Sequence, residues 1–349
     1  MPQLEIGGEL ELEWIDSQSN GRSKKAPDID TKKGQLEESN NSVPRFSIDK
    51  IVVSPKVSFD AGIVLKADLE LNPDKAVKVD EAWILIPDLP LDTWIKIGLE
   101  DVFIKPSRKT ESYPIVGHAY WQDEDLGLFM GGERDRFYWR LSLSNSRRLK
   151  DRQASEDATF PIPTYDDDNV EKNTNKQIGF GLGFDHAFKE GHWVDILPFY
   201  YHSELSDADR AYLETISTYP GGSNDDQRLY GVNLDYRLRA FSFFGQYIRS
   251  EDGEMDRWGG YIQPSFKQKL GMKRLKSLEF LLRWEVYEVD LLRDASDART
   301  WDRQTTTLAV ISEIVHGFKI KTEYYINDEE TGGPEFDNNE LLFQYEMKF

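Results

Sequence analysis

The chain has 349 residues, a formal net charge of −20 and no cysteine. The negative charge argues against nucleic-acid binding, which depends on basic patches that neutralise phosphates. No run approaches the roughly 18 apolar residues that a membrane-spanning helix needs, which excludes a helical membrane protein. A β-barrel is compatible with this composition, because its strands alternate polar and apolar residues. No linker divides the chain, so we predict one domain over residues 1–349.

The amino-terminal segment contains the clearest strand pattern of the sequence. From Leu4 to Trp14, apolar side chains alternate with glutamates and glycines. Successive side chains of a strand point to opposite faces, so the glutamates share one face, which suits a water-filled interior. The pattern starts almost at the first residue, which predicts a mature sequence with an added initiator Met. Residues 17–43 lose the periodicity and are predicted to form a long exposed loop.

Alternation recurs along the rest of the chain and predicts sixteen strands in all. A turn is predicted at Ser54-Pro55-Lys56, and residues 206–213 are expected to form a helical turn inside a loop. Glycines occupy one face of residues 178–184, which indicates that something approaches the backbone closely there. After the first strand, the predicted strands cover about 45–53, 57–70, 77–86, 93–99, 126–131, 137–144, 178–184, 193–203, 227–237, 240–250, 257–267, 277–290, 301–314, 317–327 and 341–349.

The connections between the predicted strands sort by length. Every even connection is short and most odd ones are long, with exceptions near 71–76 and 251–256. Residues 100–124 do not show the alternation of a strand. The pattern of short even and long odd connections holds if these residues are counted as one loop. Transmembrane barrels have an even strand number, with short turns at one end and long loops at the other. Aromatic residues also gather near strand ends, as an interfacial girdle requires. The sequence therefore predicts an all-β fold, a transmembrane antiparallel β-barrel of about 16 strands.

The last nine residues, Leu341 to Phe349, are apolar at every second position and end on an aromatic side chain. This pattern resembles the closing strand of bacterial outer-membrane β-barrels, in which a C-terminal Phe belongs to the assembly signal. The resemblance implies a location in the bacterial outer membrane, with membrane lipid as one partner and the barrel-assembly machinery, through Phe349, as another. An ordinary amphipathic strand in a soluble sandwich would show the same alternation.

Sixteen strands, a large third loop and a terminal Phe together resemble general and substrate-selective porins. Residues 58–131 resemble the phosphate-selective porin O/P family, in which a basic third loop, here about 100–124, folds into the lumen. The resemblance implies a passive diffusion channel for small hydrophilic or ionic solutes with an anion or phosphate preference, and leaves open whether three barrels associate. The chain is shorter than most members and lacks their run of lumen-facing arginines, which weighs against phosphate selectivity. The matching segments are Phe59-Asp60-Ala61-Gly62, Glu81-Ala82-Trp83, Lys96-Ile97-Gly98 and Lys105-Pro106.

Charged residues predicted to face the lumen are the candidates for a pore constriction. Selectivity of a water-filled channel is set by the charges at its narrowest point. The basic candidates are three residues of the third loop and two inward-facing residues on flanking strands: Lys105, Arg108, Lys109, Lys96 and Arg140. The acidic candidates lie on the first and last strands, which must be neighbours in a closed barrel: Glu9, Glu11 and Glu346. We expect a transverse field between a basic and an acidic wall; the alternative is that these charges only solvate the lumen.

Nothing in the sequence predicts an enzyme, a cofactor or a bound metal. The five histidines are scattered without metal-ligand spacing, and no nucleophile or phosphate-binding motif is present. The acidic runs Asp166-Asp167-Asp168 and Asp294-Ala295-Ser296-Asp297 lack an EF-hand pattern and are interpreted as solvated loops. The competing hypothesis from another functional class is a soluble all-β protein, for example a carbohydrate-binding module with an aromatic platform.

Overall fold

A computed structural model describes most of the chain. The described residues are 2–17, 44–71, 77–121, 124–145, 148–151, 163–166, 176–188, 191–216, 224–290, 302–330 and 339–349. The run Asp167-Asp168 and the segment from Asp294 to Asp297 lie outside them. Among the described residues, no helix has both the length and the apolar character needed to cross a membrane.

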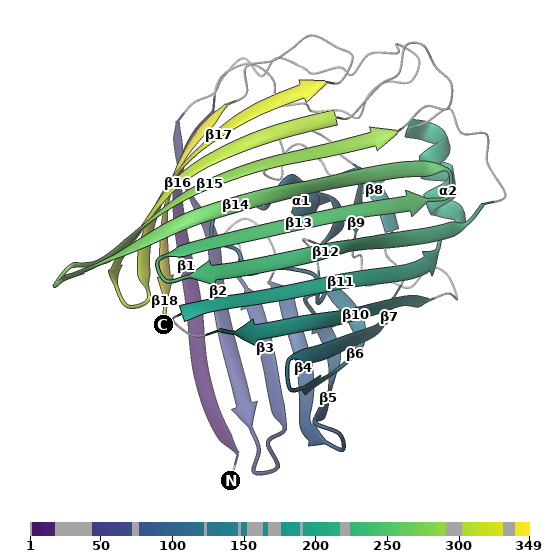
Figure 1. Ribbon diagram of the computed structural model, residues 1–349, viewed down its shortest axis with the longest axis horizontal. Helices are drawn as coiled ribbons and strands as arrows, with labels where there is room; N and C mark the ends of the chain where they lie inside the picture. Colours follow the sequence, from purple (N-terminus) through teal and green to yellow (C-terminus); the bar gives the residue numbers. More distant parts are fainter. Residues whose placement is uncertain are drawn as a thin grey trace.

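Sixteen of the described strands form one closed antiparallel barrel, in which β1 pairs with β18 to complete the ring (Figure 1). The predicted antiparallel barrel of about sixteen strands is confirmed. Its strands are β1 (Gln3–Ser17), β2 (Arg45–Ser58), β3 (Val64–Glu70), β4 (Lys78–Leu89), β5 (Thr93–Glu100), β6 (Asp125–Arg134), β7 (Phe137–Asn145), β10 (Lys176–Ala187), β11 (His192–Glu204), β12 (Asp226–Leu238), β13 (Phe241–Asp252), β14 (Met255–Met272), β15 (Leu275–Asp290), β16 (Asp302–Val315), β17 (Phe318–Glu330) and β18 (Glu340–Lys348).

The apolar and polar residues that alternate in the sequence form an apolar outer face and a polar inner face of the barrel. On β10, the side chains of Ile178, Phe180 and Leu182 are about half exposed on the outside, whereas the intervening glycines are buried on the inside. The closing seam follows the same rule: the rings of Trp14 and Phe343 lie 5.4 Å apart on the outer face. An apolar exterior around a polar interior inverts the arrangement of a soluble domain.

The carboxyl-terminal residue is hydrogen-bonded to β1 at the closing seam, where β1 and β18 complete the barrel. Phe349 donates its backbone N–H to the Gly8 carbonyl at 3.1 Å and accepts the Gly8 N–H at 3.0 Å. A Cβ atom on Gly8 would lie 2.7 Å from the Phe349 ring, so only glycine leaves space for that ring. The terminal residue is thus part of the barrel wall.

The structure corrects one predicted turn, confirms one predicted helix and contains a further short helix. Ser54-Pro55-Lys56 lies inside β2, and the turn to β3 is at residues 59–63, where Gly62 takes a φ of 75°. The β2–β3 ladder skips Ser54 and Pro55, as expected for a proline without an N–H, so the strand continues past it. Residues 115–120 form the helix α1 (Ile115–Tyr120), and α2 (Asp207–Ile216) confirms the helix predicted near residue 206.

A hydrophobic core lies on the inner side of β11 to β15. It consists of α1, Leu149 and Tyr165 of the hairpin formed by β8 (Arg148–Asp151) and β9 (Pro163–Asp166), and inward side chains of the wall. All six residues of α1 are buried. Figure 1 shows α1 and this hairpin within the outline of the barrel. Part of the interior is therefore filled by buried hydrophobic side chains.

Candidate functional site

The connection between β5 and β6, residues 101–124, runs across the interior and binds the far wall. The Ile104 carbonyl accepts hydrogen bonds from Asn233 of β12 at 2.9 Å and from Gln246 of β13 at 3.0 Å. The Trp121 indole donates to the same Gln246 at 2.8 Å. A Cβ atom on Gly181 would lie 2.9 Å from the Phe103 ring. The glycine face of β10 therefore leaves room for an apolar side chain of this connection, which we call the cross-barrel loop.

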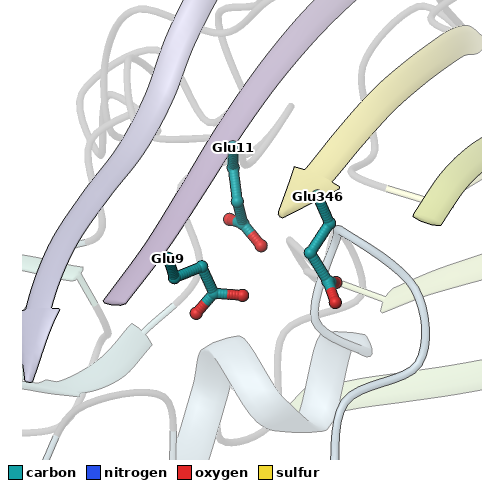
Figure 2. Close-up of side chains that lie close together, drawn as sticks. All are labelled: Glu9, Glu11 and Glu346. Carbon is teal, nitrogen blue, oxygen red and sulfur yellow. The ribbon is translucent and has the colours of Figure 1, made fainter. Parts of the chain in front are cut away.

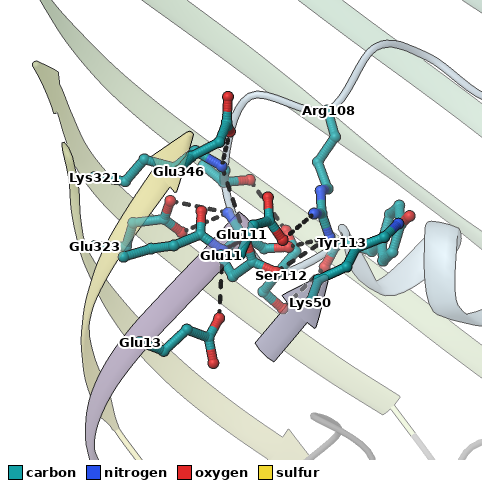
Figure 3. Close-up of polar contacts among 12 residues, drawn as sticks. Glu11, Glu13, Lys50, Arg108, Glu111, Ser112, Tyr113, Lys321, Glu323 and Glu346 are labelled. Atoms are coloured by element: carbon teal, nitrogen blue, oxygen red, sulfur yellow. Dashed lines mark hydrogen bonds and ion pairs between the residues drawn. The ribbon is translucent and has the colours of Figure 1, made fainter. Parts of the chain in front are cut away.

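Charged side chains of β15 and β17 hold the tip of the cross-barrel loop; Figure 3 shows Glu323 of β17 beside Glu111 of the loop. Both carboxylate oxygens of Glu323 accept the backbone N–H of Glu111, at 2.9 and 3.0 Å. Arg283 donates to the Thr110 hydroxyl at 2.6 Å, and Glu285 accepts the Ile115 N–H at 2.6 Å. Because these wall residues are at most 1% exposed, their charged hydrogen bonds are shielded from water and restrict the position of the tip.

All three predicted cations of the cross-barrel loop are paired with carboxylates. Lys105 contacts Asp101 and Glu124, the latter at 3.4 Å. Arg108 lies 3.2 Å from Glu111 and 3.6 Å from Glu11 of the first strand. Lys109 reaches across to β13, β14 and β15, where its ammonium lies 2.9 Å from Ser242, 2.9 Å from Ser265 and 2.7 Å from Glu279.

The two predicted cations on strands face inward and stack on aromatic rings. Lys96 forms an ion pair with Glu100 at 2.7 Å, and its ammonium lies 4.3 Å from the centre of the Trp83 ring. Arg140 pairs with Glu133 at 3.1 Å. Its guanidinium also lies over two rings, 4.7 Å from Tyr138 and 5.4 Å from Trp94. Each charged group therefore lies over an aromatic ring and beside a carboxylate.

The predicted acidic residues meet at the closing seam. Carboxylate oxygens of Glu9, Glu11 and Glu346 lie within 4.8 Å of one another (Figure 2). Each has a cation beside it: Lys348 lies 2.7 Å from Glu9, Arg108 lies 3.6 Å from Glu11, and Lys319 and Lys321 lie 2.8 Å from Glu346. The ammonium and guanidinium groups supply the positive charge that a metal ion would bring, so the carboxylates are balanced without one.

The observed charge pattern differs from the predicted basic and acidic walls. Arg108 touches the acidic seam, and Lys109 binds an acid of β15, so opposite charges interleave instead of facing each other across an aperture. Opposite charges attract more strongly where surrounding protein lowers the effective dielectric constant, which favours pairing over separation. The structure leaves the roles of the eight candidate residues in selectivity as predictions.

Beneath the cross-barrel loop, toward the end with the short turns, lies a cavity of about 890 Å³, which we call the vestibule. Residues 105–110 of the loop line it, as do inward side chains of β7 and β10 to β15. Three aspartates on adjacent strands lie side by side in its wall, because Asp185 pairs in register with Asp195 and Asp195 with Asp235. Their partners are Trp193, Tyr138 and Arg237 respectively.

The sequence interpretation missed this aspartate row. Each aspartate occupies an inward position near the short-turn end of its strand, which is the signal that could have found it. Aligning the three strands on their short-turn ends, at Ala187, His192 and Leu238, brings the aspartates into one row. The periodicity of a single strand does not contain that information, since it depends on register between strands.

Known structures share this fold. OprB of Pseudomonas putida superposes with a TM-score of 0.64 at 9% identity, over 99% of this chain and 94% of that chain. A trimer form of OmpT, an outer membrane protein of Vibrio cholerae, has a TM-score of 0.59 at 11% identity, covering 100% and 99%. OmpF of Salmonella typhi, in complex with daunomycin, has a TM-score of 0.59 at 10% identity, covering 99% and 97%. No family model and no curated protein matches the chain. The likeness shows the barrel fold.

Proposed function

We propose that the chain is a porin of the bacterial outer membrane, a passive channel for small hydrophilic or ionic solutes, without enzymatic activity. The observation that carries this proposal is a closed sixteen-stranded barrel with an apolar outer face and a water-accessible, charged cavity inside. Sixteen strands enclose a lumen wide enough for an aqueous channel, which here is narrowed by the cross-barrel loop. The similar fold of three outer-membrane proteins supports the same assignment.

The apolar character of the outer face supports membrane lipid as a partner of the barrel. Large apolar side chains are exposed around the described circumference, including Ile97 on β5, Phe180 on β10 and Leu308 on β16. A continuous apolar surface of this size would make a soluble monomer aggregate, which disfavours the soluble binding-protein hypothesis. Recognition of Phe349 by the assembly machinery and association of three barrels are further parts of this proposal.

The proposal is tested by reconstituting the detergent-extracted barrel in a planar lipid bilayer. A channel should give stepwise increases in current, and the folded barrel should migrate differently from the heated chain on a gel. A matched preparation of heat-denatured protein controls for current caused by detergent. A correctly folded barrel that conducts no ions and admits no small sugars would contradict the proposed function.

We propose weak ion selectivity, in place of a phosphate preference. The cations that a phosphate would need, Lys105, Arg108 and Lys109, are engaged by carboxylates. The wall of the vestibule also contains the aspartate row, and Arg237 donates a hydrogen bond to one of its members, Asp235. The vestibule lining as a whole carries nine Arg and Lys side chains against six Asp and Glu side chains, so the fields of the two signs oppose each other and the net preference should be weak.

The aspartate row gives a direct prediction. Changing Asp185, Asp195 and Asp235 together to Asn should move the reversal potential toward anion preference. Asn keeps an acceptor oxygen for Trp193 and Tyr138, so the hydrogen bonds can persist. The shift should be larger at low salt than at high salt, because the screening length falls from about 10 Å at 0.1 M to about 3 Å at 1 M.

The matched control replaces three exposed aspartates in or beside the short turns, Asp60, Asp88 and Asp92, by Asn. Two of them take positive φ values, which Asn also adopts readily, so the control should fold. It removes the same charge outside the vestibule and should leave the reversal potential unchanged. Equal shifts in both variants would show that net charge, and not the vestibule wall, sets the preference.

A second prediction concerns pH and Glu124 at the end of the cross-barrel loop. Burial raises the pKa of Glu124 to about 8, against the lowering effect of Lys105 at 3.4 Å. The carboxyl group is therefore neutral below that pH and negative above it. Raising the pH from about 6 to about 10 should shift ion preference toward cations in the wild type. Reversal potentials should show a smaller shift in Glu124→Gln, and a shift of the same size there would refute the assignment.

A further inference from the structure

The hairpin of β14 and β15 projects beyond the neighbouring strands at the short-turn end of the barrel (Figure 1). The ladder between β13 and β14 begins at the pair of Phe241 and Phe266, and the ladder between β15 and β16 begins at the pair of Ser277 and Glu313. Residues 268–276 lie past both pairs, so they have strand partners only within the hairpin itself. This part of the chain therefore stands free of the barrel wall.

The projecting segment is strongly basic in an otherwise acidic chain. Five of the ten residues 267–276 are Lys or Arg and none is acidic, although the whole chain has a formal net charge of −20. All five cationic residues are exposed. Lys267 pairs with Glu313 at 3.2 Å, whereas the other four form no ion pair within the described part of the chain. These four are Lys269, Lys273, Arg274 and Lys276.

An apolar groove of about 460 Å³ lies on the outer face of the barrel beside this hairpin. Its lining includes the aromatic side chains of Phe241 and Phe243 on β13, Phe266 on β14 and Phe280 on β15. The rings of Phe241 and Phe266 lie 4.8 Å apart, and Phe280 is 49% exposed. The groove is thus bounded by the last outward-facing aromatic residues of β14 and β15 before the hairpin leaves the wall.

The basic hairpin and the groove are continuous along both strands. Phe266 immediately precedes Lys267 on β14, and by alternation Lys276 shares the outer face of β15 with Leu278 and Phe280. At about 3.3 Å per residue, Lys276 lies roughly 13 Å along the strand from Phe280. A lysine stem can cover apolar surface while its ammonium group reaches the polar boundary. The two features together match a molecule with an apolar chain and an anionic head.

We propose that the basic hairpin and the apolar groove form a binding site for an anionic phospholipid of the periplasmic leaflet. The short turns of outer-membrane barrels face the periplasm, and the inference rests on this location without requiring that the barrel conducts. One acyl chain lies in the groove, and the phosphate of the headgroup lies among Lys273, Arg274 and Lys276. Each cation beside an anionic lipid strengthens binding, and the attraction falls off within a Debye length.

The groove favours a lipid over an acidic protein as the occupant. A soluble acidic segment would satisfy the cations but would leave the phenylalanine side chains of the groove uncovered. Lysines on a projecting hairpin also keep its strand edges from pairing with other chains, but that role predicts no preference among lipids. A preference for anionic lipid that depends on both the headgroup and the chain therefore distinguishes the proposed site from the other two interpretations.

Native mass spectrometry of the folded barrel in a neutral detergent measures the affinity for single lipid molecules. Dioleoyl phosphatidylglycerol and dioleoyl phosphatidylcholine carry the same chains, and only the first has a net charge. We expect phosphatidylglycerol to bind at least about tenfold more tightly at about 0.1 M salt, with a smaller ratio at about 1 M because of screening. Dihexanoyl phosphatidylglycerol should bind much more weakly, because its short chains bury less apolar surface in the groove.

Changing Lys273, Arg274 and Lys276 together to Gln should remove the preference for phosphatidylglycerol. The matched control changes three exposed cations at the same end of the barrel but away from the groove to Gln, and it should keep the preference. If the hairpin variant fails to fold, Lys276→Gln alone should still lower the preference. The control residues are Arg134, Arg136 and Lys348.

Several results would overturn the lipid site. They are equal affinity of the wild type for the two dioleoyl lipids, an unchanged preference in the hairpin variant, and an equal loss in the control. Dihexanoyl lipid that binds as tightly as the long-chain lipid would show that the groove takes no part. If a poly-glutamate peptide binds in place of phosphatidylglycerol, the partner is an acidic chain. Lipid binding is measured without ion flow, so a barrel that binds phosphatidylglycerol and carries no current would refute only the channel function.

Discussion

Replacing Arg257 by Met is expected to destabilise the barrel by about 3–5 kcal/mol, the usual cost of leaving one member of a buried ion pair without its partner. Arg257 and Asp252 are both 0% exposed, and Arg257 donates to Asp252 through two nitrogen atoms. Its guanidinium also lies between the rings of Tyr120 and Tyr165, 4.9 and 4.8 Å from their centres. Met keeps part of the packing against these rings, so the lost charge accounts for most of the expected effect.

The double variant Arg257→Met with Asp252→Asn provides the matched control. Asn at position 252 removes the uncompensated charge and keeps an acceptor for the Tyr165 hydroxyl. Equilibrium urea unfolding in lipid vesicles should therefore place the double variant between the wild type and Arg257→Met. A double variant less stable than the single one would show that the packing of Arg257, and not its charge, stabilises the interior.

The strand count and topology could be predicted because they depend on local patterns. Alternation with a period of two identifies each strand, and the lengths of the connections identify the two ends of the barrel. The one misplaced turn, at Ser54-Pro55-Lys56, shows the limit of this reasoning. Proline usually signals a turn, but here the gap in the β2–β3 ladder tolerates a residue without an N–H.

The contents of the barrel could not be predicted in the same way. The sequence identified the charged residues of the cross-barrel loop but not their partners. These partners, Glu11, Glu111 and Glu279, lie at very different separations along the chain, so no regular spacing points to them. The packed core behind the loop requires Tyr165 from a connection that reads as polar loop. Contacts of this kind depend on tertiary structure, for which periodicity carries no signal.

Replacing Lys105, Arg108 and Lys109 together by Gln should shift ion preference strongly toward cations. All three belong to the cross-barrel loop and line the vestibule. Their removal leaves the carboxylates of Glu11 and Glu279 without the cations that lie 3.6 and 2.7 Å away. Gln has a volume close to that of Lys, so conductance at high salt should change less than selectivity. Reversal potentials in a salt gradient compare the variant with the wild type.

The control removes three exposed cations from the region of the β14–β15 turn by changing Lys269, Lys273 and Arg274 to Gln. It makes the same change in net charge at residues that do not line the vestibule, and it should leave the reversal potential unaltered. Lys109→Gln alone should account for part of the shift, because this side chain spans the space between the loop and three strands. If the triple variant shows no shift, or a shift toward anions, the loop edge does not border the conducting path, since uncompensated carboxylates beside that path must attract cations.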